Sequence, residues 1–306
     1  MKVARLSHSN IEYLINPDGS RGYVWNFASG CQHGETGVCP VGDYCWARKI
    51  TERFKAHYPK GFEPDLHTNA LLSPLRLKVP ARIGVCFMGD LFGDWLDPEQ
   101  EVLFEDGYNS LKSILHFVIR ACPQHTFFFL TKAPWNLKRW GPWPQNAWVG
   151  ATAWDKESTI KATWHIETID YARRWLSFEP LLGKTDIESG TLSSMGAGIS
   201  WLVIGALTGT RADMEAARVK WPALTPMPYG RQWSLQPPVE WVREIVEAAD
   251  KVGVKVWLKN NLRPSFGGVI PYWALNKETD QLSQELPERA AIEVAGPYLR
   301  QALPGE

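Results

Sequence analysis

The chain has 306 residues, with 33 Lys and Arg, 33 Asp and Glu, and a formal net charge of zero. Hydrophobic residues make up 44% and charged residues 22%, which is ordinary for a packed globular protein and excludes a disordered, collagen-like or coiled-coil chain. A zero net charge also excludes a global field that would hold a polyanion, so a nucleic acid would have to bind a local patch.

Seven short apolar runs, each ending in small or polar residues, predict seven β-strands. They begin at Gly22, Arg82, Thr126, Ala147, Arg173, Ser200 and Lys255. Helical patterns lie between them, at residues 43–57, 98–120, 156–169 and 238–252. This alternation predicts an α/β fold with a parallel sheet. Because no glycine-rich phosphate loop follows the first strand, a partial or complete (β/α) barrel is favoured over an open doubly wound sheet.

The domain organisation follows from where this alternation weakens. We expect residues 1–261 to form the barrel, with an elaborated loop at 208–237 that is rich in Pro, Gly, Arg and Trp. Residues 262–306 are expected to be a C-terminal extension packed on the barrel. The sixteen Trp residues are interpreted as core filling rather than as stacking platforms for bases.

The location in the cell is predicted from two missing signals. The N-terminus lacks the apolar core of a signal peptide, and no segment reaches the ~18 uninterrupted apolar residues of a membrane span. We therefore expect a cytoplasmic protein that does not enter a membrane.

Five cysteines without a secretion signal argue against a disulfide framework and favour thiol or metal chemistry. Three of them, Cys31, Cys39 and Cys45, lie in GCQHGETGVCPVGDYCWAR, between the first predicted strand and the first predicted helix. The other two, Cys86 in a strand and Cys122 at a helix end, are expected to be core residues.

The three clustered cysteines have the spacing C-x7-C-x5-C, in a loop that would open at the catalytic end of a parallel barrel. Three thiolates can hold zinc with His33 as a fourth ligand. They can also hold three irons of a [4Fe-4S] cluster and leave the fourth iron open. The remaining interpretation is three unrelated thiols. Neither spacing is the C-x2-C knuckle that is common in structural zinc sites.

A set of sequence blocks resembles a known family. The blocks WNFASGC, MGDLF, CPQHTFFFLTK, AWVGATAWD and SFEPLLG follow in this order between residues 22 and 261. Together they resemble an uncharacterised bacteriophage family, named after gene products thirty-seven and sixty-eight, that is related to the radical S-adenosylmethionine (SAM) superfamily.

The resemblance implies a barrel of the radical SAM type with a [4Fe-4S] cluster on Cys31, Cys39 and Cys45. S-adenosylmethionine would chelate the open iron, and an electron from the cluster would cleave it to a 5'-deoxyadenosyl radical that abstracts hydrogen from a substrate. Tyr44 would pack beside the adenine. Two features depart from the family pattern: the motif ends in C-x5-C rather than C-x2-C, and GALTG stands at 205–209 in place of an acidic GGESG block.

Functional residues of barrel enzymes lie at the carboxyl ends of strands. Asp90 is predicted either to accept a hydrogen bond from the amino group of the cofactor or to cap a turn. Thr152 and Glu179 are predicted to bind the cofactor. Glu179 and Lys259 are the predicted catalytic pair, expected to form an ion pair or to face a polar ligand, because an unpaired charge among apolar residues costs several kcal/mol.

Two functions from different classes remain open. The leading hypothesis is a radical SAM-like iron-sulfur enzyme that acts on a nucleotide, a nucleic-acid base or a peptide and receives electrons from a redox partner. The alternative is a zinc- or cluster-stabilised barrel that binds a nucleic acid or a protein without catalysis. Iron content and visible absorbance discriminate between iron and zinc.

Overall fold

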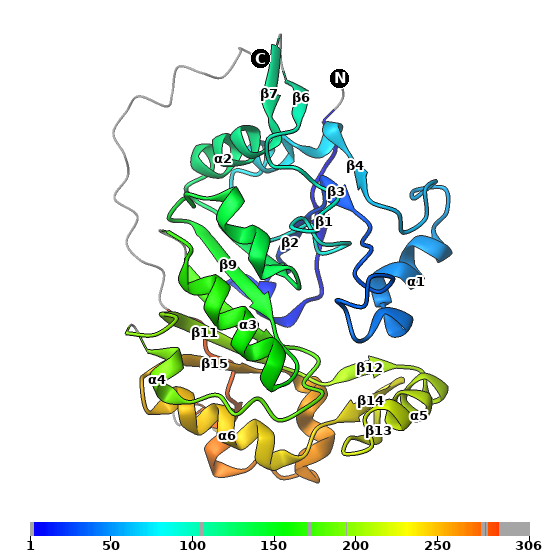
Figure 1. The fold of residues 1–306 in the computed structure, drawn as a ribbon, viewed down its shortest axis with the longest axis vertical. Helices are drawn as coiled ribbons and strands as arrows, with labels where there is room; N and C mark the ends of the chain where they lie inside the picture. Colours follow the sequence, from blue (N-terminus) through cyan, green and yellow to red (C-terminus); the bar gives the residue numbers. More distant parts are fainter. Residues whose placement is uncertain are drawn as a thin grey trace.

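The structure is a computed structural model that describes residues 3–104, 107–170, 173–193, 195–276, 279 and 281–287. Its largest element is an eight-stranded sheet with the order β1-β2-β5-β8-β9-β10-β11-β15 (Figure 1). These strands span Ser7–His8, Tyr23–Trp25, Arg82–Val85, Thr126–Thr131, Ala147–Thr152, Arg173–Phe178, Ile199–Ile204 and Lys255–Leu258.

All seven predicted strands are present, and consecutive ones are parallel neighbours. Among these eight strands β1 is the antiparallel one, at the edge beside β2. The prediction of a mixed α/β fold with a mostly parallel sheet is therefore confirmed. Within the described residues β1 and β15 are the two edges and no pairing joins them, so the sheet is open and gives no support to a complete barrel.

The α-helices are α1 to α6, and they agree only in part with the predicted patterns. They span Trp46–Arg53, Leu111–Ala121, Lys156–Glu167, Ser189–Leu192, Arg211–Lys220 and Val239–Asp250. The predicted helices at 156–169 and 238–252 are confirmed as α3 and α6. The one predicted at 43–57 is shorter, because its first residues form a 3-10 turn at Gly42–Tyr44 before α1. Further 3-10 helices span Glu12–Leu14, Thr68–Ala70, Ser73–Arg76, Pro134–Trp140, Asn260–Phe266 and Tyr272–Ala274.

The long helix predicted at 98–120 is wrong in its first half. Strands β6 (Glu101–Phe104) and β7 (Gly107–Ser110) form an antiparallel hairpin before α2 begins. Val102 is buried while Leu103 is exposed, which is the two-residue period of a strand. The Ser110 side chain then accepts a hydrogen bond from Ser113 N and caps α2.

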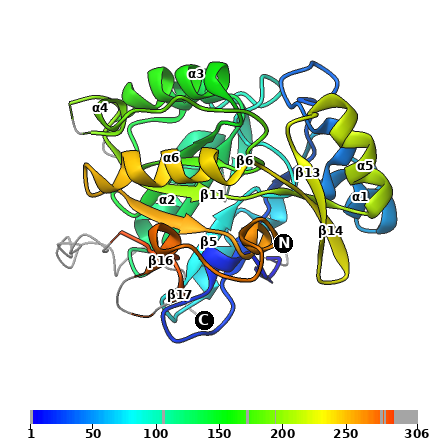
Figure 2. The same ribbon diagram turned by 90° about the horizontal axis from the view of Figure 1, so that it is seen from below.

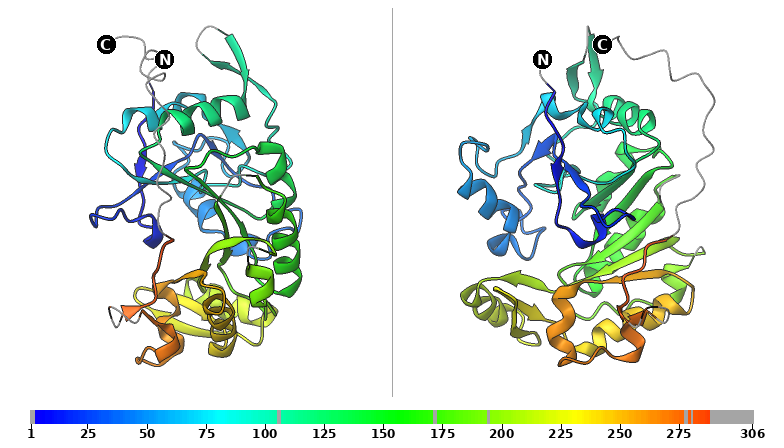
Figure 3. Two further views of the ribbon diagram at one scale, coloured as in Figure 1. Left: turned by 90° about the vertical axis from the view of Figure 1, so that its left-hand side faces the viewer. Right: turned by 180° about the vertical axis from the view of Figure 1, so that it is seen from behind.

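The two faces of the sheet carry different cores. Side chains of α2, α3, α4 and α6 pack with alternate strand residues in one large apolar cluster, so these helices cover one face (Figures 2 and 3). The opposite face, called the inner face below, is lined by a second cluster that is rich in aromatic rings: Tyr13, Phe128, Trp148, Trp175, Trp201 and Trp257. For these Trp residues the interpretation as core filling is confirmed.

Residues 208–237, predicted as an elaborated loop, are instead an ordered unit. Strands β12 (Leu207–Gly209), β13 (Thr225–Tyr229) and β14 (Gln232–Gln236) form an antiparallel sheet in the order β12-β14-β13, and α5 lies within the same segment. A capping box between Thr210 and Asp213 begins α5. We call residues 207–236 the inserted unit.

The described part of the C-terminal extension packs along β15. Leu258 N donates to Ser283 O at 2.8 Å and Glu285 N donates to Val256 O at 3.0 Å, which continues the sheet with an antiparallel segment. Short strands β16 (Leu275–Asn276) and β17 (Gln281–Leu282) pair nearby, and β3 (Ala28–Ser29) pairs with β4 (Asp65–Leu66) elsewhere. The division at residue 261 stays a prediction, and residues 288–306 lie outside the described part. No helix among the described residues is long and apolar enough to cross a membrane.

Candidate metal and cofactor site

The cysteine loop, residues 31–45, leaves the sheet at its carboxyl edge through a tight contact between two glycines. Gly30 N donates to Met88 O at 3.0 Å, and Gly30 forms a bridge with Gly89 in the segment that follows β5. A Cβ on Gly89 would lie 2.2 Å from Gly30 O, so no other residue fits there. Cys31 N then donates to Phe62 O at 3.1 Å. The first cysteine is thus held on two sides by backbone.

The loop also closes on itself. Cys39 N donates to His33 O at 2.8 Å, and a Cβ on Gly42 would lie 2.6 Å from the Gly34 Cα. The two limbs of the loop therefore touch through glycines, and Cys39 is held beside His33. All three cysteines of the loop are partly exposed, whereas Cys86 and Cys122 are 2% and 1% exposed, as predicted for core residues.

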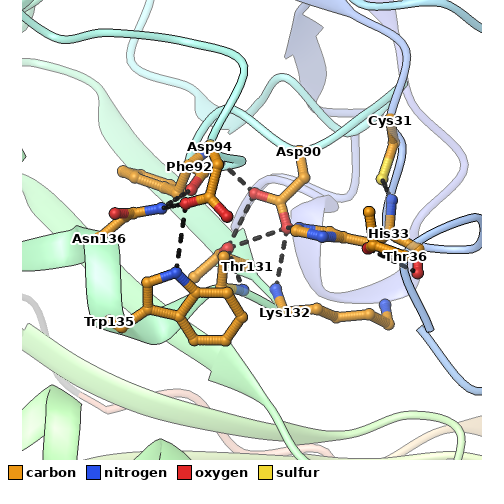
Figure 4. Close-up of polar contacts among 11 residues, drawn as sticks. Cys31, His33, Thr36, Asp90, Phe92, Asp94, Thr131, Lys132, Trp135 and Asn136 are labelled. Carbon is orange, nitrogen blue, oxygen red and sulfur yellow. Dashed lines mark hydrogen bonds and ion pairs between the residues drawn. The ribbon is translucent and has the colours of Figure 1, made fainter. Parts of the chain in front are cut away.

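The Asp90 carboxylate fastens the loop to the sheet (Figure 4). It is 7% exposed and accepts hydrogen bonds from His33 Nε2 at 3.0 Å, Lys132 N at 2.9 Å and Phe92 N at 3.0 Å. The Thr131 hydroxyl, at the end of β8, donates to both carboxylate oxygens at 2.8 and 2.9 Å. Burial by itself would raise the pKa of Asp90, but these hydrogen bonds, above all the one from His33, outweigh it and hold the pKa below its usual value.

The predicted role of Asp90 in cofactor binding stays a prediction, and the structure favours the other interpretation that the sequence left open. Its oxygens already accept from protein donors, including Phe92 N two residues on, as in a turn cap. We therefore treat Asp90 as a positioning residue, because it joins His33 of the cysteine loop to Thr131 at the end of β8.

The electrostatic surroundings of the cysteines depend on Lys132, which directly follows β8. Burial and the nearby Asp90 carboxylate raise the pKa of the Cys31 thiol to about 12. Burial would lower the pKa of Lys132, but Cys39, Asp90, Cys31 and Cys45 together raise it above its usual value. Lys132 therefore stays a cation beside all three thiols. A free Cys31 stays protonated at neutral pH, so it becomes a thiolate only with a positive partner such as a metal.

A zinc site that uses His33 is not preformed. Among the residues that the structure describes, no group of three or more His, Cys, Asp or Glu side chains is arranged around a single ion. His33 Nε2 is directed at Asp90 instead. A single zinc needs all its ligands within about 2.3 Å of one point, whereas a four-iron cluster binds each thiolate at a different iron. The same finding covers Cys31, Cys39 and Cys45, so the described residues hold no preformed site for either metal centre.

Glu179 and Lys259 meet on the inner face, as predicted from the ends of their strands. Lys259 Nζ donates to Glu179 Oε1, and the side chains are 15% and 25% exposed for Lys259 and Glu179. A Cβ on Gly205 would lie 3.1 Å from Lys259 Cδ and 3.2 Å from Glu179 Cγ, so the glycine between them leaves room for the pair. Burial would lower the pKa of Lys259, but the Glu179 carboxylate raises it.

Two polar side chains that the sequence did not single out lie one level below this pair. Ser177 and Trp257 precede Glu179 and Lys259 by two residues, which places them on the same face. Ser177 of β10 pairs with Val203 of β11, which in turn pairs with Trp257 of β15, so Ser177 and Trp257 lie at the same level of the sheet. Both are buried, and neither Ser177 Oγ nor Trp257 Nε1 has a hydrogen-bond partner in the described structure. The sequence signal that would have found Ser177 and Trp257 is the alternation of strand faces, since each lies two residues before Glu179 or Lys259.

The other predicted cofactor residues occupy two places. Thr152 ends β9, is 3% exposed and pairs in register with Ser177, so it lies on the inner face. Tyr44 packs edge-on against Trp221 of the inserted unit, with ring centroids 6.4 Å apart. Their predicted contacts with adenine and cofactor stay predictions.

Comparison with known proteins identifies the family. Residues 9–223 match the family described as "Protein of unknown function (DUF5131)". This is more than half of the chain, so the protein belongs to that family. Among curated proteins, no sequence matches the chain.

Four chains of solved structures match the fold. One is a tyrosine-to-phenylalanine mutant of spore photoproduct lyase, at 12% identity and a TM-score of 0.48, covering 84% of this chain and 80% of that one. Another is a cysteine-to-alanine mutant of spore photoproduct lyase with dinucleoside spore photoproduct, at 11% identity and a TM-score of 0.45, with the same coverage of 84% and 80%. Likenesses at this level assign neither an activity nor a substrate.

The substitution Asp90→Asn is expected to destabilise the protein by about 1–3 kcal/mol, because it removes a buried carboxylate acceptor and turns an amide NH2 toward donors. Chemical unfolding of both proteins, monitored by Trp fluorescence, measures the change. Asp97→Asn, which alters an exposed ion pair with Arg139, is the control and should cost less than about 1 kcal/mol. Equal effects of the two changes would contradict the positioning role.

The destabilisation caused by Asp90→Asn should also depend on pH. A depressed pKa in the folded state means that the stabilisation is complete above the unfolded value of about 3.9 and is lost as the pH falls through the folded value. The difference in melting temperature between the two proteins should therefore be constant near neutral pH and shrink below about pH 4. A difference that grows on acidification would contradict the assignment.

Proposed function

We propose that this protein is a radical SAM-like enzyme whose [4Fe-4S] cluster is held by Cys31, Cys39 and Cys45. The observation that carries the proposal is the cysteine loop at the carboxyl edge of the first parallel strand, with three partly exposed cysteines near the half-buried cation Lys132. The resemblance to the bacteriophage family supports the same assignment. Membership of the phage family is part of the proposal.

The chain's own residues divide into two groups around the inner face. When bound, the cluster and S-adenosylmethionine would supply the electron and the carbon radical that abstracts hydrogen from a substrate. The cysteine loop would hold the cluster on one side. On the other side Glu179 and Lys259 would bind and orient the polar part of cofactor or substrate, with Thr152 between the two sides. A redox partner would reduce the cluster beforehand.

The substrate classes that we propose are a nucleotide, a nucleic-acid base or a peptide. Each carries amide-like donors and acceptors that an ammonium–carboxylate pair can satisfy. The aromatic layer below excludes water from the lower inner face, because its Trp rings are almost fully buried. Polar recognition is therefore concentrated at the carboxyl ends of the strands.

The cluster assignment predicts a selective loss of iron. Each of Cys31→Ala, Cys39→Ala and Cys45→Ala should abolish most bound iron and sulfide after anaerobic reconstitution, because a cluster with two protein ligands is poorly held. Cys122→Ala is the control and should keep both. Full iron in Cys45→Ala, loss in Cys122→Ala, or stoichiometric zinc without visible absorbance would contradict the assignment.

The proposed chemistry predicts that reduced, reconstituted protein cleaves S-adenosylmethionine to 5'-deoxyadenosine, at least slowly without substrate. Chromatography of the nucleoside measures it, with Cys39→Ala as the control. A protein with a complete cluster that neither binds nor cleaves S-adenosylmethionine would favour the non-catalytic binding function instead.

The pair on the inner face predicts a binding defect without metal loss. Glu179→Gln should weaken S-adenosylmethionine binding about tenfold or more, since a charge-assisted hydrogen bond contributes ~1.5–3 kcal/mol. Calorimetry measures affinity and iron analysis should be unchanged. Glu244→Gln, which removes an exposed ion pair with Lys184, is the control. A lower melting temperature with normal affinity would indicate a purely structural pair.

A further inference from the structure

The second half of the cysteine loop packs against the inserted unit. Val41 is buried in an apolar cluster with Leu207, Met214 and Leu235, and Cys39 and Tyr44 pack against the same cluster. The sheet itself supplies few of these contacts. Residues between Cys39 and Cys45 are therefore placed by the segment 207–236 rather than by the parallel strands.

Polar contacts join the same two surfaces. Lys220 Nζ, at the end of α5, donates to Pro40 O at 3.0 Å, and Lys49 Nζ of α1 donates to Asp213 Oδ2 at 2.9 Å. Asp213 also accepts from Thr210 N in the capping box, so the first turn of α5 is tied to α1. Helices α1 and α5 accordingly lie on the same side of the molecule in Figure 1.

These contacts involve the residues that lengthen the motif. Five residues separate Cys39 from Cys45, and Pro40, Val41 and Tyr44 among them make the contacts with the inserted unit. The longer spacing thus has a use in this chain. The five-residue spacing provides the Val41 side chain and the Pro40 carbonyl that contact the inserted unit. A two-residue spacing would not provide both.

We propose that the inserted unit is a clamp that positions Cys39 and Cys45, with Lys220 and Trp221 as positioning residues, whereas Asp90 and the glycine contacts position Cys31. This inference rests on the proposed function in that the cysteines are taken as cluster ligands. The contacts themselves exist without a cluster, and they can be tested without one.

The test is site-resolved alkylation of the metal-free protein with iodoacetamide, read by peptide mass spectrometry. In the double variant Lys220→Met, Trp221→Ala, Cys39 and Cys45 should react about tenfold faster, because a hydrogen bond and a ring contact that hold their segment are lost. Cys31 should change less than about twofold. Arg218→Met, which removes an exposed charge from the same helix, should change none of the three.

The Asp90→Asn variant is the reciprocal arm, and it should accelerate Cys31 more than Cys39 or Cys45. Lys220→Arg should restore the rates of Lys220→Met, since it can donate to Pro40 O. Equal acceleration of all three cysteines in the double variant, or no change in any, would overturn the clamp.

A second readout uses reconstituted protein. Iron should pass to a chelator several-fold faster from the double variant than from Arg218→Met. If no cluster forms in any variant but the alkylation pattern holds, the proposed function fails and the clamp stands. If the cluster forms and alkylation is unchanged in the double variant, the clamp alone fails.

Discussion

The buried carboxylate of Asp90 is the interaction on which the rest of the site depends. Its hydrogen bonds join His33 of the cysteine loop to Thr131 and Lys132 at the end of β8. A carboxylate removed from water is stable only when such donors surround it. Because His33 lies two residues beyond Cys31, the same bonds that keep Asp90 ionised fix the first cysteine relative to the sheet. The same hydrogen bonds therefore determine both the position of Cys31 and the ionised state of Asp90.

The inner face is arranged in levels that separate packing from polar contacts. Strand register places Thr152, Ser177 and Trp257 on one row, at the top of the aromatic cluster and below Glu179 and Lys259. Tightly packed Trp rings cannot rearrange without opening cavities. Above these rigid rings, Gly205 has no side chain that would crowd Glu179 and Lys259, so the carboxylate of one and the ammonium of the other can meet. The polar end of each strand is thus supported by its own apolar residues.

The sequence predicted those features that arise from local patterns. All seven parallel strands were found because each is a nearly continuous apolar run, and Glu179 and Lys259 were paired because each follows such a run. The hairpin before α2 and the inserted unit were missed, since β6, β7, β13 and β14 are stabilised by partners across the turn rather than by a strong pattern of their own. The bond between His33 and Asp90 joins residues 57 positions apart, which no local pattern encodes.

Lys132 provides a positive charge next to the three cysteines of the loop. Burial and the Asp90 carboxylate both raise the pKa of Cys31, so the loop resists ionisation of its first thiol. Lys132 directly follows the residue whose hydroxyl binds Asp90, so the backbone that donates to Asp90 also brings an ammonium to the cysteines. A cation at this point favours the deprotonated thiols that metal binding requires. One short segment after β8 therefore provides both the anchor and the counter-charge of the candidate metal site.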